Sequence, residues 1–121
     1  MPVKRNMDYA AATELELYAQ NDRECYEMKK PFVLNMARRM VMRTYKPKKF
    51  KPSLAWKLWM YYIDRVAAKY CKDFCQRGAR VADTFPLPVR QRAARLTAAF
   101  EAEAIRAGEY GELKNLKHWR L

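Results

Sequence analysis

The chain has 121 residues, which suits one domain with one hydrophobic core. Half of the residues are hydrophobic, which argues against disorder, and there are no alternating runs of Val, Ile or Thr from which to build strands. The 25 basic and 13 acidic side chains give a net charge of +12, and the longest apolar run, Leu58 to Ile63, is far below the roughly 20 residues of a membrane span.

We expect one all-α domain over residues 1–121, a bundle of about four main helices. The first is predicted over residues 8–30, and its apolar residues recur at helical spacing. They are Ala11, Leu15, Tyr18 and Cys25. Asn21 and Asp22 interrupt this stripe, and such residues can end one helix and cap the next. The pattern leaves open whether residues 8–30 form one helix or two.

A second helix is predicted over residues 31–44, because proline is favoured in a first turn and disfavours helix in the residue before it. Pro31 would therefore mark its start. Its apolar face would hold Val33, Leu34, Ala37, Met40 and Val41. Residues 45–52 contain two prolines and four lysines, and we expect a basic loop there.

The clearest helix is predicted over residues 54–76, with Ser53 as N-cap and Gly78 as a C-terminal glycine cap. A connection over 79–85 leads to a last helix over 87–107, which Gly108 ends, and to a C-terminal tail over 109–121. The last helix should turn Val89, Ala93, Leu96, Phe100 and Ala104 inward. Across the bundle, the predicted core includes Leu58, Ile63, Val66, Tyr70, Leu96 and Phe100.

Charge is concentrated in residues 31–57, which hold eight basic side chains and no acid. A field of one sign attracts anionic partners, and contact with them would release counterions. These eight residues are the predicted binding site for nucleic acid or another anionic partner: Arg38, Arg39, Arg43, Lys46, Lys48, Lys49, Lys51 and Lys57.

A secondary basic face is predicted in the first half of the last helix, at Arg90, Arg92 and Arg95. Cations near a helix N-terminus oppose the helix dipole, at about a few tenths of a kcal/mol for each exposed charge. Either these arginines are retained to bind a partner, or the energetic cost is too small to be selected against. Among the aromatic residues, Trp56 and Tyr61 are the better candidates for exposed stacking contacts with single-stranded nucleic acid.

No pattern predicts a catalytic or metal site. Nucleophilic catalysis needs a base beside the nucleophile, and the only histidine, His118, lies in the tail. Cys71 and Cys75 could join Cys25 and His118 around zinc, but the spacing is wrong for common zinc modules, and we expect the cysteines in the core. The carboxylate pairs Asp64 with Asp73 and Glu101 with Glu103 are interpreted as partners of ion pairs on helix surfaces.

Several landmarks resemble a group of small uncharacterised proteins encoded by tailed bacteriophages. The most specific are Lys57-Leu58-Trp59 and Gly108-Glu109-Tyr110, within a pattern that covers residues 8–110. The lysine- and proline-rich insert 46–52 departs from the shorter loop of that group. The resemblance implies a small helical phage protein in a bacterial cytoplasm, and it implies no activity and no site residues.

These observations predict a non-enzymatic, phage-type binding protein that engages nucleic acid or a nucleic-acid-handling host machine. Two alternatives stay open: a structural or assembly subunit of a larger particle, and an inhibitor of a host enzyme or defence system. No cofactor and no membrane contact are expected, and the oligomeric state is left open. Three cysteines and the absence of an apolar stretch behind Lys4 and Arg5 favour a reducing, cytoplasmic location.

Overall fold

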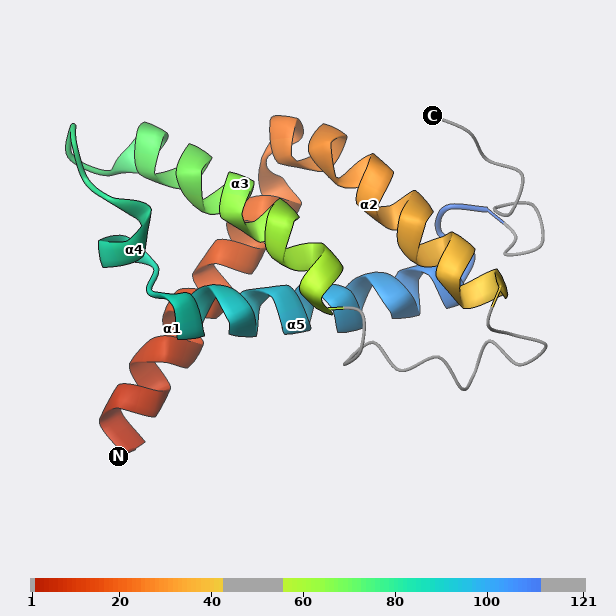
Figure 1. Cartoon of the computed structure of the whole chain (residues 1–121), viewed down its shortest axis with the longest axis horizontal. Coiled ribbons are helices and arrows are strands. Elements are labelled where there is room, and N and C mark those ends of the chain that lie inside the picture. The colour runs from red at the N-terminus through yellow and green to blue at the C-terminus, as the bar shows by residue number, and fades with distance from the viewer. Residues whose placement is uncertain (1, 43–55, 112–121) are drawn as a thin grey trace.

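The structure is a computed structural model that describes residues 2–42 and 56–111, with side chains for residues 9–40 and 56–111. Within these ranges the chain forms five helices and no strand, which confirms the all-α bundle. The helices are α1 (Pro2–Asn21), α2 (Arg23–Met42), α3 (Trp56–Phe74), α4 (Val81–Thr84) and α5 (Leu87–Arg106). Helix α5 packs mainly on α3 and α1, and α2 contacts the other three long helices (Figure 1).

The range predicted as 8–30 contains two helices, which meet at Asp22. The carboxylate of Asp22 accepts a 3.0 Å hydrogen bond from the backbone N–H of Cys25, and its carbonyl accepts one of 2.9 Å from Tyr26. Such bonds satisfy donors that a helix N-terminus leaves unpaired. The interruption in the apolar stripe was therefore a helix boundary, and Asp22 is the cap.

The predicted boundary at Pro31 is wrong, because α2 continues through this residue from Arg23 to Met42. Proline removes one helical hydrogen bond and crowds the preceding turn, but Pro31 itself is exposed. The helix buries apolar side chains on both sides of it, among them Cys25 before and Val33 and Met36 after. Packing of one continuous face thus outweighs the local preference.

The two predicted long helices in the second half of the chain match α3 and α5 to within two residues at each end that is described. Ser53 and the basic loop 45–52 lie outside the described residues. Gly108 ends α5 in a left-handed conformation (φ +79°), and the N–H of Glu109 donates to the carbonyl of Ala104 across it. Gly78 instead lies in a turn closed by a bond from Ala79 to Gln76, beyond the end of α3.

Helix α4 was missed, since residues 79–85 were predicted as a plain connection. One turn of helix is too short for a 3.6-residue periodicity to appear in the sequence. It ends at Phe85, which is buried and whose ring lies 5.1 Å from that of Tyr70. The short helix therefore places the buried Phe85 ring against α3. Pro86, the next residue, is the N-cap of α5.

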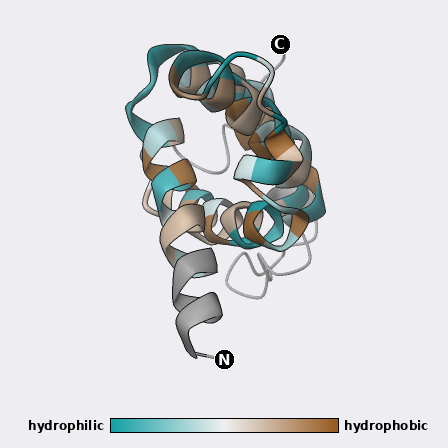
Figure 2. Cartoon of the chain, turned by 90° about the vertical axis from the view of Figure 1, so that its left-hand side faces the viewer, coloured by the Kyte–Doolittle hydropathy of each residue, from teal (hydrophilic) through white to brown (hydrophobic). Residues whose placement is uncertain are grey.

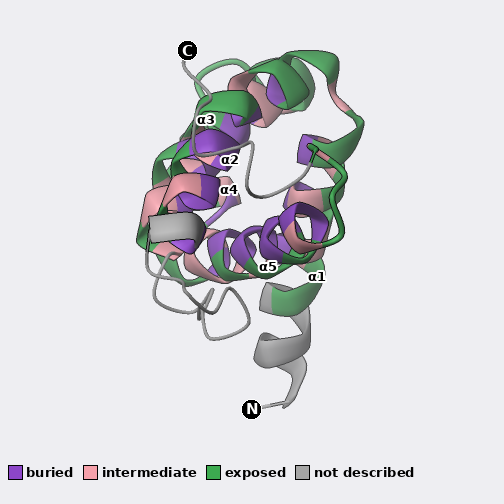
Figure 3. Ribbon diagram, turned by 90° about the vertical axis from the view of Figure 1, so that its right-hand side faces the viewer, coloured by how far each residue is buried: buried purple, intermediate pink, exposed green. Residues whose placement is uncertain are grey.

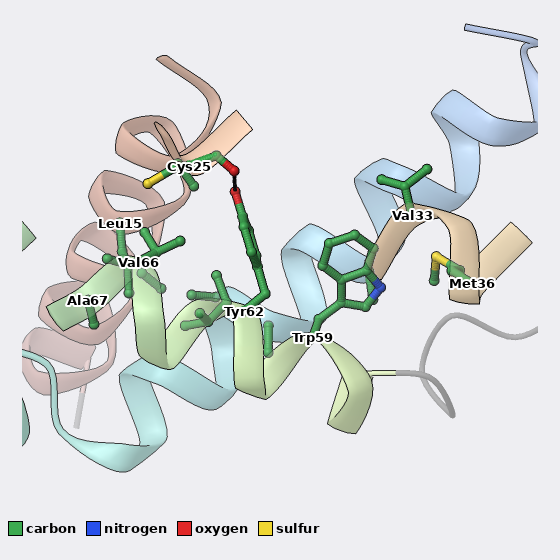
Figure 4. Packing of buried hydrophobic residues seen from close by; sticks show 14 of the residues in the cluster. Leu15, Cys25, Val33, Met36, Trp59, Tyr62, Val66 and Ala67 are labelled. Atoms are coloured by element: carbon green, nitrogen blue, oxygen red, sulfur yellow. Dashed lines mark hydrogen bonds between the residues drawn. The ribbon is translucent and has the colours of Figure 1, made fainter. Parts of the chain in front are cut away.

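The core lies where the four long helices face one another, and exposed residues cover the outside (Figure 3). Each ribbon changes between hydrophobic and hydrophilic residues along its length, as amphipathic helices do (Figure 2). Trp59 and Tyr62 lie edge to face with ring centroids 5.6 Å apart (Figure 4). The Tyr62 hydroxyl donates a 3.0 Å hydrogen bond to the carbonyl of Cys25, which satisfies a buried donor.

Two of the six predicted core residues, Ile63 and Val66, are fully buried. Leu58, Tyr70 and Leu96 are partly buried against the core. Phe100 is a correction, because 46% of it is exposed. Helix α5 buries Val89, Ala93 and Ala104 as predicted, but its buried face is broader than the predicted stripe and extends away from Phe100. That face consists largely of small residues: Ala93, Ala94, Thr97, Ala98 and Ala102. They allow α5 to approach both α1 and α3.

Candidate nucleic-acid interface

Three of the eight residues predicted in the main basic site are described. Arg38 and Arg39 lie near the end of α2, and Lys57 lies in the first turn of α3, where it is exposed. The Nε of Arg39 donates a 3.0 Å hydrogen bond to Asn35 one turn earlier. The other five predicted residues lie outside the described side chains: Arg43, Lys46, Lys48, Lys49 and Lys51.

The side chain of Arg90, which was predicted in the secondary basic face, instead makes contacts within the protein. Its Nη1 lies 2.8 Å from a carboxylate oxygen of Asp64 on α3, and its Nε donates to the carbonyl of Phe85 at 2.9 Å. A charged hydrogen bond of this length is among the stronger polar contacts. Arg90 thus fixes the start of α5 against α3, and we remove it from the candidate interface.

Arg92 and Arg95 are placed differently, each over an aromatic ring of another helix. The guanidinium of Arg92 lies 4.9 Å from the ring centroid of Tyr9 on α1, and that of Arg95 lies 4.7 Å from the Trp56 ring on α3. No described carboxylate lies within ion-pair distance of either. Both line a surface depression of about 520 Å³ together with Pro88, Gln91 and Leu96.

The outer face of α3 carries further cations. Lys57, Tyr61, Arg65 and Lys72 are all exposed, at spacings of four, four and seven residues. Such spacings place them on one side of a helix, opposite Trp59, Val66 and the other buried residues of α3. The described acid on this side is Asp64, which is paired with Arg90.

These two sets of residues come near each other at the start of α3, where Arg95 lies over the ring of Trp56 and Lys57 is the next residue. We call them together the α3–α5 basic face: Lys57, Tyr61, Arg65, Lys72, Arg92 and Arg95. Sequence reasoning singled out four of the six and missed Arg65 and Lys72. The spacing of cations opposite the apolar stripe of α3 was the signal that could have found them.

The exposed acids that the structure describes lie mostly on other helices. Glu14 on α1 and Glu24 and Glu27 on α2 are exposed, as are Glu103 and Glu109 near the end of α5. Asp83 is also exposed, on α4, which packs on α3. Asp73 is on α3, but it contacts Tyr18 of α1 and Lys69 rather than the outer face. The separation leaves the α3–α5 basic face with five cations that no described acid neutralises.

Asp22 and Asp73 belong to a polar cluster around Lys69 that joins α1, α2 and α3. The ammonium of Lys69 lies 2.8 Å from Asp73 and 3.2 Å from Asp22, and it donates to the Tyr18 hydroxyl at 3.1 Å. The hydrogen bond from the backbone of Cys25 lowers the pKa of Asp22, and that from Lys69 lowers the pKa of Asp73. The Asp73–Lys69 contact is the predicted ion pair within one helix, whereas Asp64 pairs between helices.

Glu101 corrects the prediction that its carboxylate lies on the surface. Only 1% of the residue is exposed, and its Oε1 lies 3.0 Å from the ammonium of Lys29, itself 8% exposed. The Tyr110 hydroxyl donates to the other oxygen of Glu101 at 2.6 Å. The adjoining cavity measures about 10 Å³, room for a single water molecule, so we assign this cluster to stability and not to substrate binding.

The cysteines lie largely in the interior, as the sequence predicted. Cys25 and Cys71 are buried and Cys75 is half-buried, and all three are free thiols. Burial raises the pKa of Cys25 to about 12, which keeps its thiol protonated and unreactive at neutral pH. Within residues 9–40 and 56–111, no three His, Cys, Asp or Glu side chains are arranged to hold a metal ion, and His118 lies outside that part.

None of the described helices combines the length and the apolar character needed to cross a membrane. Comparison with protein-family models, with curated proteins and with solved structures gave no match for this chain.

Proposed function

We propose that this protein is a non-enzymatic binding protein, of the phage type that its sequence resembles, and that it holds nucleic acid on the α3–α5 basic face. In this proposal the lysines of residues 45–52, which lie outside the described residues, contact the same nucleic acid, and the protein acts in the bacterial cytoplasm. The observation that carries the proposal is the placement of Arg92 and Arg95, one turn apart on α5, each over a ring from a neighbouring helix.

Ring contacts of this kind orient a guanidinium without neutralising it. A cation over an aromatic face gains about 0.5–1 kcal/mol at an exposed site, and the N–H groups at the guanidinium edge stay free to bind phosphate. A carboxylate partner would instead compete with phosphate for the same donors. The two arginines are therefore ordered, charged and open to an anionic ligand.

The test is binding of labelled oligonucleotides of about 16 residues, measured by fluorescence anisotropy from about 50 to 200 mM salt. We expect measurable binding at low salt that weakens as salt rises. The double variant Arg92→Gln/Arg95→Gln should lower the slope of log K against log salt by about 1.4–1.8, since each phosphate contact contributes about 0.7–0.9.

The control of equal charge is Arg23→Gln/Lys30→Gln, which removes two exposed cations from α2, a helix that contributes no residue to the α3–α5 basic face, and of these Lys30 pairs with Glu27 at 2.9 Å. It should change the slope much less. An equal loss in both variants would mean that net charge alone is responsible. Absence of binding at about 50 mM salt would overturn the proposal. The partner would then be an acidic protein surface, as expected for a subunit of a larger particle or for an inhibitor of a host enzyme.

A further inference from the structure

We propose that the nucleic acid on the α3–α5 basic face is single-stranded and that the ring of Tyr61 stacks on one of its bases. This inference rests on the proposed function and specifies its ligand. It starts from the most exposed large hydrophobic side chain that the structure describes: Tyr61 is 71% exposed on the outer face of α3.

Tyr61 differs from the other strongly exposed ring of the same helix, Phe74, which is 68% exposed. The Phe74 ring packs on Tyr18 and Tyr70, with centroids 5.7 Å and 5.1 Å apart. Tyr61 makes no hydrogen bond and no ring contact with any described residue. Its ring therefore offers an open flat surface, whereas part of the Phe74 ring is already used within the protein.

The surroundings of Tyr61 suit a polyanion. Lys57 precedes it and Arg65 follows it by four residues, so a cation lies about 6 Å along the helix axis on either side. Proteins that bind single strands without sequence preference combine a positively charged track for the backbone with aromatic rings for the bases. Lys57, Tyr61 and Arg65 reproduce that combination on one helix face. Arg95 adds a further cation near the start of α3, where it lies over the ring of Trp56.

A single strand fits this face better than a duplex because stacking needs an unpaired base surface. In a duplex, each base is covered on both faces by its neighbours, and an exposed tyrosine can reach only the backbone or a groove. In a single strand, the bases can be splayed out and stacked on aromatic side chains. The cations alone could bind the phosphates of either a single strand or a duplex. The exposed Tyr61 ring is therefore the feature that favours the single strand.

The experiment compares a labelled oligo(dT) with a blunt duplex of equal length, each of about 16 nucleotides, against the wild-type chain and Tyr61→Ala. We expect tighter binding of oligo(dT), and a loss of about 5- to 150-fold for it in Tyr61→Ala. The salt slope should stay unchanged, because no charge is removed. Tyr61→Phe should bind like the wild type, and Tyr61→Trp should show quenched fluorescence on binding.

Phe74→Ala is the matched control, since it removes an equally exposed ring of α3 that packs on Tyr18 and Tyr70, and it should leave oligo(dT) binding unchanged. Equal affinity for duplex and oligo(dT), with Tyr61→Ala no weaker than Phe74→Ala, would overturn this inference while the proposed function stands. Competition by oligo-glutamate as strong as that by oligo(dT) would point to an acidic protein and overturn both. Binding of neither nucleic acid would also overturn both.

Discussion

The ammonium of Lys29 lies 3.0 Å from a carboxylate oxygen of Glu101, so one buried ion pair joins α2 to α5. Two tyrosine rings lie close to the same ammonium, that of Tyr26 at 4.7 Å and that of Tyr110 at 5.7 Å from its Nζ. Tyr110 also donates to Glu101, and so it ties the residues that follow α5 to the pair. Buried charges carry a desolvation penalty that only well-placed partners offset.

Replacing Glu101 by Gln should destabilise the fold by about 3–5 kcal/mol, because Lys29 would remain buried without a counter-charge. Urea unfolding followed by circular dichroism measures the loss. Glu103→Gln is the control, since Glu103 is exposed and pairs with Arg106 on the helix surface. A loss below about 0.5 kcal/mol for Glu101→Gln, the scale of surface substitutions, would contradict the role assigned to the pair.

Truncating Ile63 to Ala should cost about 2–5 kcal/mol, since the side chain is fully buried between helices and leaves a cavity. Thermal or urea unfolding gives the difference. Tyr61→Ala, two residues away on the exposed side of α3, should change stability by no more than about 0.5 kcal/mol. The second result also matters for binding, because it shows that any loss of affinity in Tyr61→Ala is not a loss of fold.

Stability should fall at alkaline pH. Burial raises the pKa of Tyr18 to about 12, and a hydrogen bond to Glu14 raises the pKa of Tyr70 to about 12. Both hydroxyls bind their protons more tightly in the folded state than in the unfolded state. Their contribution to folding stability is therefore complete below about pH 10 and is lost as the pH rises toward about 12. The urea concentration at the unfolding midpoint should therefore decrease as the pH is raised from about 10 to about 12. Tyr70→Phe should make the decline shallower, and a flat profile would refute the prediction.

The predicted basic loop can be tested directly although it lies outside the described residues. If Lys48, Lys49 and Lys51 contact phosphates, their joint replacement by Gln should lower the salt slope by about two to three units. Replacing Arg23, Lys30 and Arg80, three exposed cations outside the loop and the α3–α5 basic face, removes the same charge and should have a smaller effect. Identical slopes for the two triple variants would assign the binding to net charge.

The sequence by itself determined the helical class and the extents of α3 and α5. Both helices show apolar periodicity over five or six turns, and in α5 a proline at the start and a glycine at the end coincide with the limits of that periodicity. It also determined that Asn21 and Asp22 interrupt the first apolar stripe, although choosing between one helix and two required the observed hydrogen bond from Cys25 to Asp22.

Only the tertiary structure decided the questions that depend on which helices meet. Pro31 lies inside α2 because the apolar face of the helix continues on both sides of it. Helix α5 buries its alanines because it packs on both α1 and α3. For the same reason spacing could not tell Glu101, buried beside Lys29, from the exposed Glu103 two residues on. Nor could it separate Arg90, bound to Asp64, from Arg92 and Arg95 on their rings, because the partner of a long side chain is set by its neighbours in space.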